Sequence, residues 1–107
     1  MSASPIDKTS AGAGQMAPGV ARRVVTICNQ RGLHARAAAQ FVKKAGQFDA
    51  EVMVRKNGTE VSGRSIMGLM MLAAAPGTVI RLAASGRDAE AAVNALVKLI
   101  ECKFDED

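Results

Sequence analysis

The dipeptide Asn57-Gly58 constrains the fold more than any other feature of the sequence. Asn-Gly favours the positive φ angles of a type I′ turn, which joins neighbouring antiparallel strands. The residues on both sides suit strands, because Glu51 to Lys56 alternates polar and apolar side chains and Thr59 to Ser62 is β-compatible. The sequence therefore predicts a β-hairpin in the middle of the chain and a mostly antiparallel sheet.

Two further elements are expected before this hairpin. Val20 to Cys28 is rich in β-branched residues, as is typical of a strand, and the polar turn Asn29 to Gly32 ends it. From Leu33 to Ala45, apolar residues recur at three- and four-residue spacing. This spacing predicts a helix that ends at Gly46.

Three elements are expected after the hairpin. Ser65 is a good N-cap for a helix over the apolar stretch from Ile66 to Ala75, which Pro76-Gly77 ends. Thr78 to Ala84 is a further strand, and a last helix begins near Asp88. The order strand, helix, strand, strand, helix, strand, helix predicts an α+β fold with one mostly antiparallel sheet covered on one face by helices.

The chain of 107 residues is long enough for one small domain and too short for two independent cores. Met1 to Gly19 has no apolar periodicity and contains two of the three prolines, which is typical of a flexible tail. We therefore expect the folded domain to cover residues 20–107.

The sequence favours a cytoplasmic protein without membrane insertion. No apolar run reaches the roughly 18 residues of a membrane helix, and no secretory signal pattern begins the chain. Cys28 and Cys102 lie too far apart in sequence to suggest a disulfide framework or a metal-ligand cluster. We expect no metal and no cofactor.

His34 is the only histidine, and it lies where the first strand gives way to the first helix. The backbone N–H groups of Ala35, Arg36 and Ala37 would lie near its ring, together with the positive end of the helix dipole. The guanidinium of Arg36 offers planar donors that suit phosphate oxygens. These residues predict a phosphoryl cradle with a nucleophilic imidazole. The alternative is a helix-capping surface histidine beside a solvated arginine.

Two motifs resemble one known family. The segment Gly32 to Ala38, GLHARAA, resembles the active-site signature of HPr, the histidine-containing phosphocarrier of the phosphoenolpyruvate phosphotransferase system. The segment Arg64 to Met70, RSIMGLM, resembles the regulatory-serine signature of the same family at the expected distance. The resemblance covers about Val20 to Phe104, and it implies an HPr-like open-faced sandwich in which three helices cover one face of a four-stranded sheet.

The resemblance also implies roles for individual residues. His34 would accept phosphate on Nδ1 from phosphorylated enzyme I and pass it to an enzyme IIA-type protein, while Arg36 holds the phosphate oxygens. Ser65 would be the target of an HPr kinase/phosphorylase. The chain would then be a phosphoryl carrier, an intermediate for partner enzymes and not itself an enzyme. The family usually has proline where this chain has Ala37; alanine restores an N–H and suits a helix, so we expect carrier function to survive.

The second helix is apolar at almost every position, and a short surface helix cannot bury all of it. Methionine is flexible and polarisable, which suits a surface that accepts several partners in turn. Ile66, Leu69 and Leu72 are expected in the core, and Met67, Met70 and Met71, with Lys43 on a basic rim, are expected to form a docking patch. Core filling by these methionines is the alternative. We expect a monomer.

A small basic nucleic-acid-binding or protein-interaction module without phosphotransfer is the main alternative function. Nine basic and three acidic residues lie between Arg22 and Arg64. The chain has no Trp or Tyr, so it lacks an aromatic platform for bases, and its charge is better explained by acidic protein partners. The acidic end Phe104 to Asp107, with Ser65, favours a regulatory, nitrogen-related phosphotransferase chain over sugar uptake.

Overall fold

The computed structural model describes residues 19–106, so the predicted tail lies outside the described residues except for Gly19. The described part contains the strands and helices in the predicted order, followed by a short 3₁₀ turn. The elements are β1 (Val20–Thr26), α1 (Ala35–Ala45), β2 (Glu51–Lys56), β3 (Thr59–Ser62), α2 (Ile66–Met71), β4 (Val79–Ser85), α3 (Ala89–Glu101) and the turn Lys103–Asp105. None of the helices in this part is long and apolar enough to cross a membrane.

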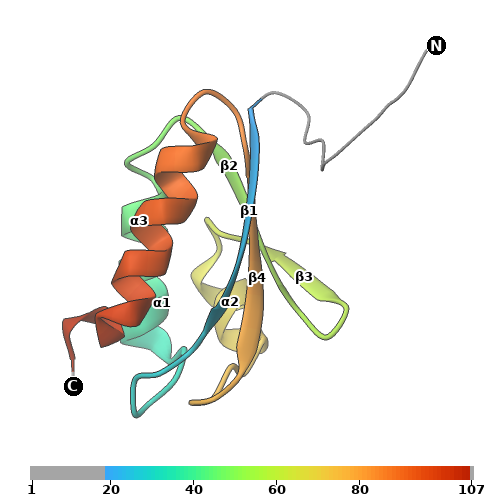
Figure 1. The fold of residues 1–107 in the computed structure, drawn as a ribbon. Helices are drawn as coiled ribbons and strands as arrows, with labels where there is room; N and C mark the ends of the chain where they lie inside the picture. Colours follow the sequence, from blue (N-terminus) through green and yellow to red (C-terminus); the bar gives the residue numbers. More distant parts are fainter. Residues whose placement is uncertain (1–18, 107) are drawn as a thin grey trace.

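The four strands form one sheet in the order β1-β4-β2-β3, and every neighbouring pair is antiparallel. The helices lie on one side of this sheet and leave its other side open (Figure 1). The predicted open-faced sandwich is therefore confirmed.

The core lies between the sheet and the helices. Alternate strand residues point into it, because successive side chains of a strand face opposite sides. Its largest fully buried apolar side chains are Ile27, Val52, Val54, Ile80 and Leu82 from the sheet side, and Phe41, Leu69, Val93, Leu96, Ile100 and Phe104 from the helical side.

The central hairpin has the predicted turn. Asn57 and Gly58 both have positive φ, at 50° and 88°, and Lys56 pairs with Thr59 across the turn. These are the backbone angles that a two-residue type I′ turn requires. The predicted hairpin turn between β2 and β3 is therefore confirmed.

The predicted second helix was too long. It ends at Met71 and not at Ala75, because Ala73 turns into the left-handed region at φ 51°. Lys56 Nζ then donates to the backbone oxygens of Leu72, at 2.8 Å, and of Ala73, at 3.3 Å. An amine from β2 thus satisfies carbonyl groups that the helix leaves without partners.

Two smaller expectations were also wrong. Ile66 is 40% exposed and not part of the core, because it is the first residue of a helix of six residues that buries only Leu69. The first strand ends at Thr26 and not at Cys28. Ile27 still bonds to the turn before β4, since its N–H donates to the Thr78 oxygen at 2.8 Å, but the regular pairing stops there.

The chain after α3 turns back toward the start of α1. Lys103, Phe104 and Asp105 all have φ between 54° and 58°. Such left-handed residues cost about 1–2 kcal/mol each for side chains other than glycine. Complete burial of Phe104 offsets this cost, and Gln40 Nε2 donates to the Phe104 backbone oxygen at 3.0 Å. We call residues 103–106 the C-terminal hook.

Candidate phosphoryl-binding site

The loop between β1 and α1 sets the position of His34. Gly32 has φ 66°, and a Cβ on it would lie 2.4 Å from the Ala74 backbone oxygen, so only glycine fits. The next amide, Leu33 N–H, donates to that same oxygen at 2.9 Å. His34 follows as the N-cap of α1, with extended backbone angles, and its own carbonyl accepts from Ala38 N–H at 2.8 Å.

The ring of His34 is bound at both nitrogens. The backbone N–H of Arg36 donates to Nδ1 at 3.3 Å, and Nε2 lies 2.8 Å from Oε2 of Glu106. A backbone N–H is only a donor, so Nδ1 must present a lone pair to it. The hydrogen of the neutral ring is then on Nε2, where it is donated to the carboxylate. This arrangement leaves Nδ1 as the nucleophilic nitrogen.

Glu106 is held in place by a second buried contact. Its Oε1 accepts from Nδ2 of Asn29 at 3.1 Å, and the same Nδ2 donates to the Gly32 backbone oxygen at 2.8 Å. Asn29 is fully buried, and the Glu106 side chain is only 11% exposed against 23% for His34. The Asn29 side-chain amide thus links the loop before His34 to the Glu106 carboxylate, which follows α3.

Sequence reasoning missed both Asn29 and Glu106 as site residues. It assigned Asn29 to a polar turn, and it interpreted the acidic C-terminal residues only as a sign of a nitrogen-related phosphotransferase chain. Glu106 lies 72 residues from His34, and no local pattern reports a contact at that separation. The one available signal was an Asn in a turn directly before the predicted nucleophile, because Asn side chains often bond to nearby backbone groups.

The predicted phosphate partners lie around the first turn of α1. Arg36 is exposed, and its guanidinium has no carboxylate partner among residues 19–106. Ala35 is exposed, whereas the Ala37 side chain is buried. The first turn of α1 contains no acidic residue, so its amides and the positive end of the helix dipole are not neutralised locally.

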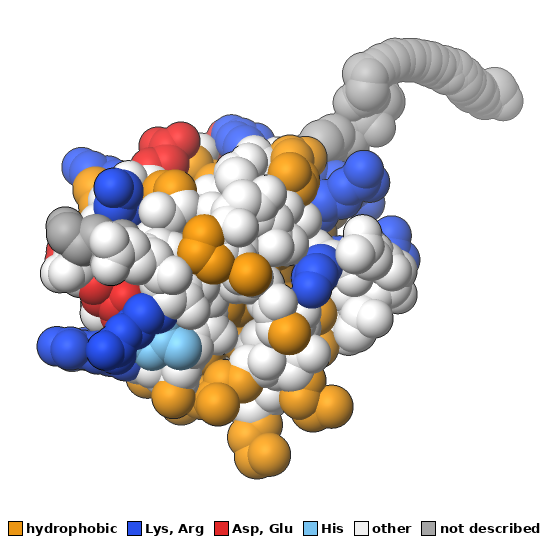
Figure 2. Space-filling model, turned by 90° about the horizontal axis from the view of Figure 1, so that it is seen from below, with side chains coloured by type: hydrophobic (Ala, Val, Ile, Leu, Met, Phe, Trp, Pro, Cys, Tyr) orange, Lys and Arg blue, Asp and Glu red, His pale blue; other side chains and the backbone are white. Residues whose placement is uncertain are grey.

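A hollow of about 320 Å³ lies beside Arg36 and Glu106, the two residues that bond to the ring of His34. Its lining combines basic, amide and acidic groups: Gln30, Arg31, Arg36, Gln40, Asp105 and Glu106. In Figure 2 the histidine reaches the surface with basic and acidic side chains on one side and hydrophobic ones on the other. This mixture can hold an anion near His34 without enclosing it.

Ser65 occupies the predicted position at the start of α2. It is the N-cap, and its Oγ accepts from Gly68 N–H at 2.9 Å. The residue is half-buried, and α2 packs against α1, the helix that begins after His34. The capping part of the prediction is therefore confirmed.

The three methionines of α2 point outward as predicted. Met67, Met70 and Met71 are 73%, 43% and 77% exposed, and Lys43 on α1 is exposed as well. Figure 2 shows hydrophobic side chains gathered on the same end of the molecule as the histidine. An apolar surface therefore adjoins the candidate site.

The described range 19–106 contains no group of three or more His, Cys, Asp or Glu side chains placed to hold a metal ion. The charged side chains around the site are Arg31, Arg36, Asp105 and Glu106, and the helix dipole adds positive charge at the start of α1.

Comparison with known proteins gives consistent matches over nearly the whole described range. A family described as "PTS HPr component phosphorylation site" matches residues 21–102. "Phosphocarrier protein HPr" of Neisseria meningitidis is 52% identical over 85 residues, which cover 79% of this chain and 96% of that protein. "Phosphocarrier protein NPr" of Shewanella violacea is 45% identical over 84 residues, covering 78% and 92%. The crystal structure of HPr-C-His from Thermoanaerobacter tengcongensis matches with a TM-score of 0.78 and 45% identity, covering 81% and 98%.

Proposed function

Because the chain belongs to the HPr family, whose members are phosphocarriers of the phosphotransferase system and not catalysts, we propose that His34 carries its phosphoryl group. One observation carries this proposal: Nδ1 faces the amide at the start of α1 while Nε2 faces the Glu106 carboxylate. We infer that phosphorylated enzyme I is the donor and that an enzyme IIA-type protein is the acceptor.

The transfer step follows from this geometry. The Nδ1 lone pair of His34 attacks phosphorus while the N–P bond of the donor's phosphohistidine breaks, and the donor nitrogen keeps the bonding electron pair. The His34 ring gains positive charge as the new bond forms. Glu106 stabilises that charge through Nε2–H, a charge-assisted hydrogen bond at 2.8 Å. Such transfer requires mainly positioning and charge stabilisation.

Arg36 supplies the donors for the incoming phosphoryl oxygens. Its backbone N–H lies at the long distance of 3.3 Å from Nδ1, so this amide can bond to a phosphoryl oxygen once Nδ1 is substituted. The guanidinium, without a carboxylate partner in the described chain, can take a second oxygen. The N–H groups of Ala35 and Ala37 complete the cradle, because first-turn amides have no acceptor within the helix.

The same site must also release the group. Nδ1 faces the exposed first turn of α1, and the His34 side chain is itself 23% exposed, so a phosphoryl group there would be accessible to the next protein. This exposure supports a relay in which the phosphoryl group stays transferable.

We further propose that Ser65 is a regulatory phosphorylation site for an HPr kinase/phosphorylase. A phosphate at this N-cap would be compatible with α2, because the N-terminal end of a helix favours negative charge. It would place about two negative charges beside the exposed methionines of α2. The expected consequence is weaker docking of partners with acidic surfaces, not a change of fold.

The docking patch, defined as Met67, Met70, Met71 and Lys43, is proposed as the surface that receives enzyme I and the acceptor in turn. Its support is the exposure of the methionines and their place on a helix packed against α1. Apolar side chains with a basic rim suit partners of mixed apolar and acidic character.

The predicted nitrogen-related branch and the predicted monomer stay predictions. Relatives named HPr and NPr both match the chain, so the branch is best assigned by acceptor preference. Rates of transfer from the phosphorylated chain to an enzyme IIA of each branch would rank the two directly.

The carrier proposal is tested by incubating the full chain with phosphoenolpyruvate and enzyme I, followed by intact-mass analysis. We expect one acid-labile phosphate adduct on the natural chain and none on His34→Ala. An adduct that persists on His34→Ala would move the carrier residue elsewhere. No adduct, under conditions that phosphorylate a known HPr, would contradict the relay from enzyme I.

A further inference from the structure

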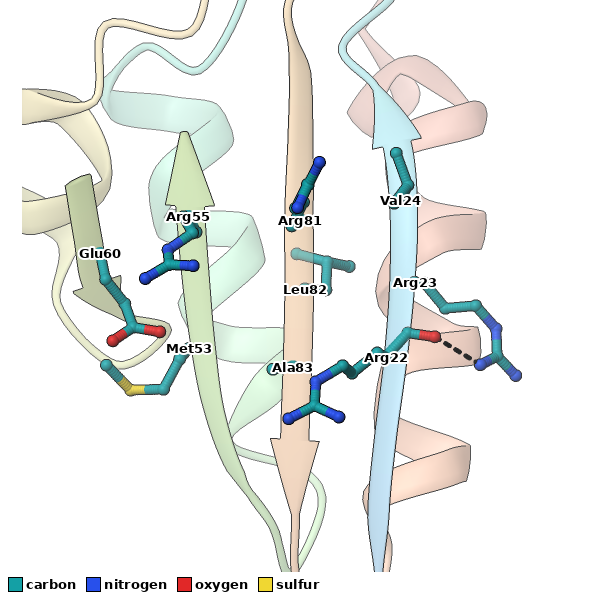
Figure 3. Close-up of a pocket in the computed structure, with 9 residues that line it drawn as sticks. All are labelled: Arg22, Arg23, Val24, Met53, Arg55, Glu60, Arg81, Leu82 and Ala83. Atoms are coloured by element: carbon teal, nitrogen blue, oxygen red, sulfur yellow. Dashed lines mark hydrogen bonds between the residues drawn. The ribbon is translucent and has the colours of Figure 1, made fainter. Parts of the chain in front are cut away.

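The face of the sheet that carries no helix presents three arginines from three different strands. Arg22 lies on β1, Arg55 on β2 and Arg81 on β4, and all three are exposed. Figure 3 shows their side chains in front of the sheet, with the helices behind it. This surface is therefore separate from the candidate site at the start of α1.

The strand register brings the three charges together. Arg55 and Arg81 are direct cross-strand partners, and Arg22 pairs with Ala83, two residues beyond Arg81 on β4. Directly opposed side chains begin about 5 Å apart and diagonal ones about 7–8 Å apart. Like charges at such positions repel each other, so the face keeps this arrangement at a cost to stability.

None of the three guanidinium groups has an ion-pair partner within residues 19–106. Glu60 is the cross-strand partner of Arg55, yet the two side chains form no ion pair. The neighbouring Arg23 differs, because its Nη2 binds Glu90 of α3 and donates to Asn94 Oδ1 at 3.2 Å. Within residues 19–106, an ion pair thus neutralises the charge of Arg23, whereas the three arginines of the open face have no such partner.

The same arginines line a hollow of about 530 Å³. Met53 and Ala83, which lie in the same cross-strand row as Arg22, give it an apolar floor (Figure 3). A second hollow of about 340 Å³ shares Arg55 and Arg81 and extends toward the central hairpin turn. These volumes fall within the range of about 300–1,000 Å³ that is usual for small-molecule sites.

We propose that this arginine face, defined as Arg22, Arg55 and Arg81 with Met53 and Ala83, binds a small phosphate monoester. A phosphate dianion among the arginines would offset their mutual repulsion, and guanidinium donors match phosphate oxygens in geometry. The apolar floor would contact the organic part of the ester.

The surroundings favour a compact ligand over a long polyanion. Glu60 lines the hollow on the β3 side, and Glu51 lies two residues before Met53 on the same face of β2. An extended acidic peptide or a nucleic acid would meet these carboxylates as well as the arginines. Phe41 and Phe104 are buried in the core, and Phe48 packs against it, so no aromatic side chain is available here for bases.

The test is a titration of the full chain with phenyl phosphate, followed by amide shifts in ¹H–¹⁵N NMR spectra. We expect saturable shifts at Met53, Arg81 and Ala83, and weaker binding of benzenesulfonate, which has the same ring and a single charge. Arg55→Gln and Arg81→Gln should each weaken binding by about tenfold, as expected for one lost charge-assisted hydrogen bond. Arg87→Gln, at an exposed loop arginine, is the matched control and should leave the affinity unchanged.

Four results would overturn the proposal. They are the absence of saturation, shifts confined to Ala35 and Arg36 at the start of α1, equal affinity in all three variants, and tighter binding of an octaglutamate peptide or a single-stranded oligonucleotide than of phenyl phosphate. Phosphorylation by enzyme I should be unchanged in Arg81→Gln. The arginine-face proposal and the His34 proposal can therefore fail independently.

Discussion

Replacing Glu106 by glutamine tests the link between the C-terminal hook and the nucleophile. Glutamine keeps the shape of the side chain, and its one carbonyl oxygen can still accept from His34 Nε2–H, so the ring tautomer should be retained. Its NH₂ group cannot accept from Asn29 Nδ2, so that contact is lost. The substitution removes the negative charge that faces the ring at 2.8 Å in a largely buried contact. The effect should therefore fall mainly on the transfer step, with a loss of about 1 kcal/mol of stability from the contact with Asn29.

The magnitude follows from the type of hydrogen bond lost. A hydrogen bond to a charged group contributes about 1.5–3 kcal/mol, whereas a neutral one contributes about 1 kcal/mol. The difference of about 0.5–2 kcal/mol applies to a ring that becomes positive during transfer, so Glu106→Gln should slow phosphorylation of His34 by about 2- to 30-fold. Glu106→Ala should slow it further, because Nε2–H then loses its partner and the ring can populate the other tautomer.

The assay is the rate of phosphoryl transfer from enzyme I in rapid-quench experiments at several carrier concentrations. We expect the maximal rate to fall while the apparent affinity for enzyme I is unchanged, which separates positioning from docking. Asp105→Asn is the matched control, since Asp105 lines the same hollow but makes no bond to the ring. The reasoning is refuted if both Glu106 variants keep the natural rate and ¹⁵N shifts still show hydrogen on Nε2 alone.

Three further substitutions test the supports of the site. Phe104→Ala should lower the free energy of unfolding by about 3–5 kcal/mol and release Glu106 from the ring of His34. Urea denaturation and the ¹⁵N shifts of the His34 ring would detect these effects, and an unchanged midpoint would contradict the anchoring role of Phe104. Gly32→Ala should destabilise the chain by more than about 1 kcal/mol and reduce phosphorylation, because its Cβ would lie 2.4 Å from the Ala74 oxygen; wild-type stability would show that the loop can relax. Ala37→Pro should keep the helix, since a first-turn proline gives up no helical hydrogen bond, and should slow phosphorylation by no more than a few-fold, because the Ala37 N–H is only one of several donors in the cradle. A much larger loss of rate would show that this N–H is the main donor to the phosphoryl group.

The parts of the fold that the sequence predicted correctly depend on local chemistry. The hairpin follows from Asn57-Gly58 and the N-cap of α2 follows from Ser65, and both depend on contacts between residues close in sequence. The end of α2 was placed too late because the signal lies elsewhere in the chain. It depends on Lys56, whose amine reaches the Leu72 and Ala73 oxygens from β2.

The candidate site was predicted in part for the same reason. His34 and Arg36 are neighbours in sequence, so their cradle could be expected from the start of a helix. The Glu106 carboxylate, which orients the His34 ring, is brought there by a left-handed turn after α3, and no local sequence pattern predicts that turn. Burial of Phe104 and the amide of Asn29 bring Glu106 to the ring, and both contacts exist only in the folded chain.

The most direct test of the central claim is to identify the phosphorylated atom. The full chain, labelled with ¹⁵N in histidine, is phosphorylated by enzyme I and phosphoenolpyruvate, and ³¹P–¹⁵N couplings are recorded. The account predicts a single phosphorus bonded to Nδ1 of His34, with hydrogen retained on Nε2 opposite Glu106. Phosphorus on Nε2, or on a residue other than His34, would contradict it.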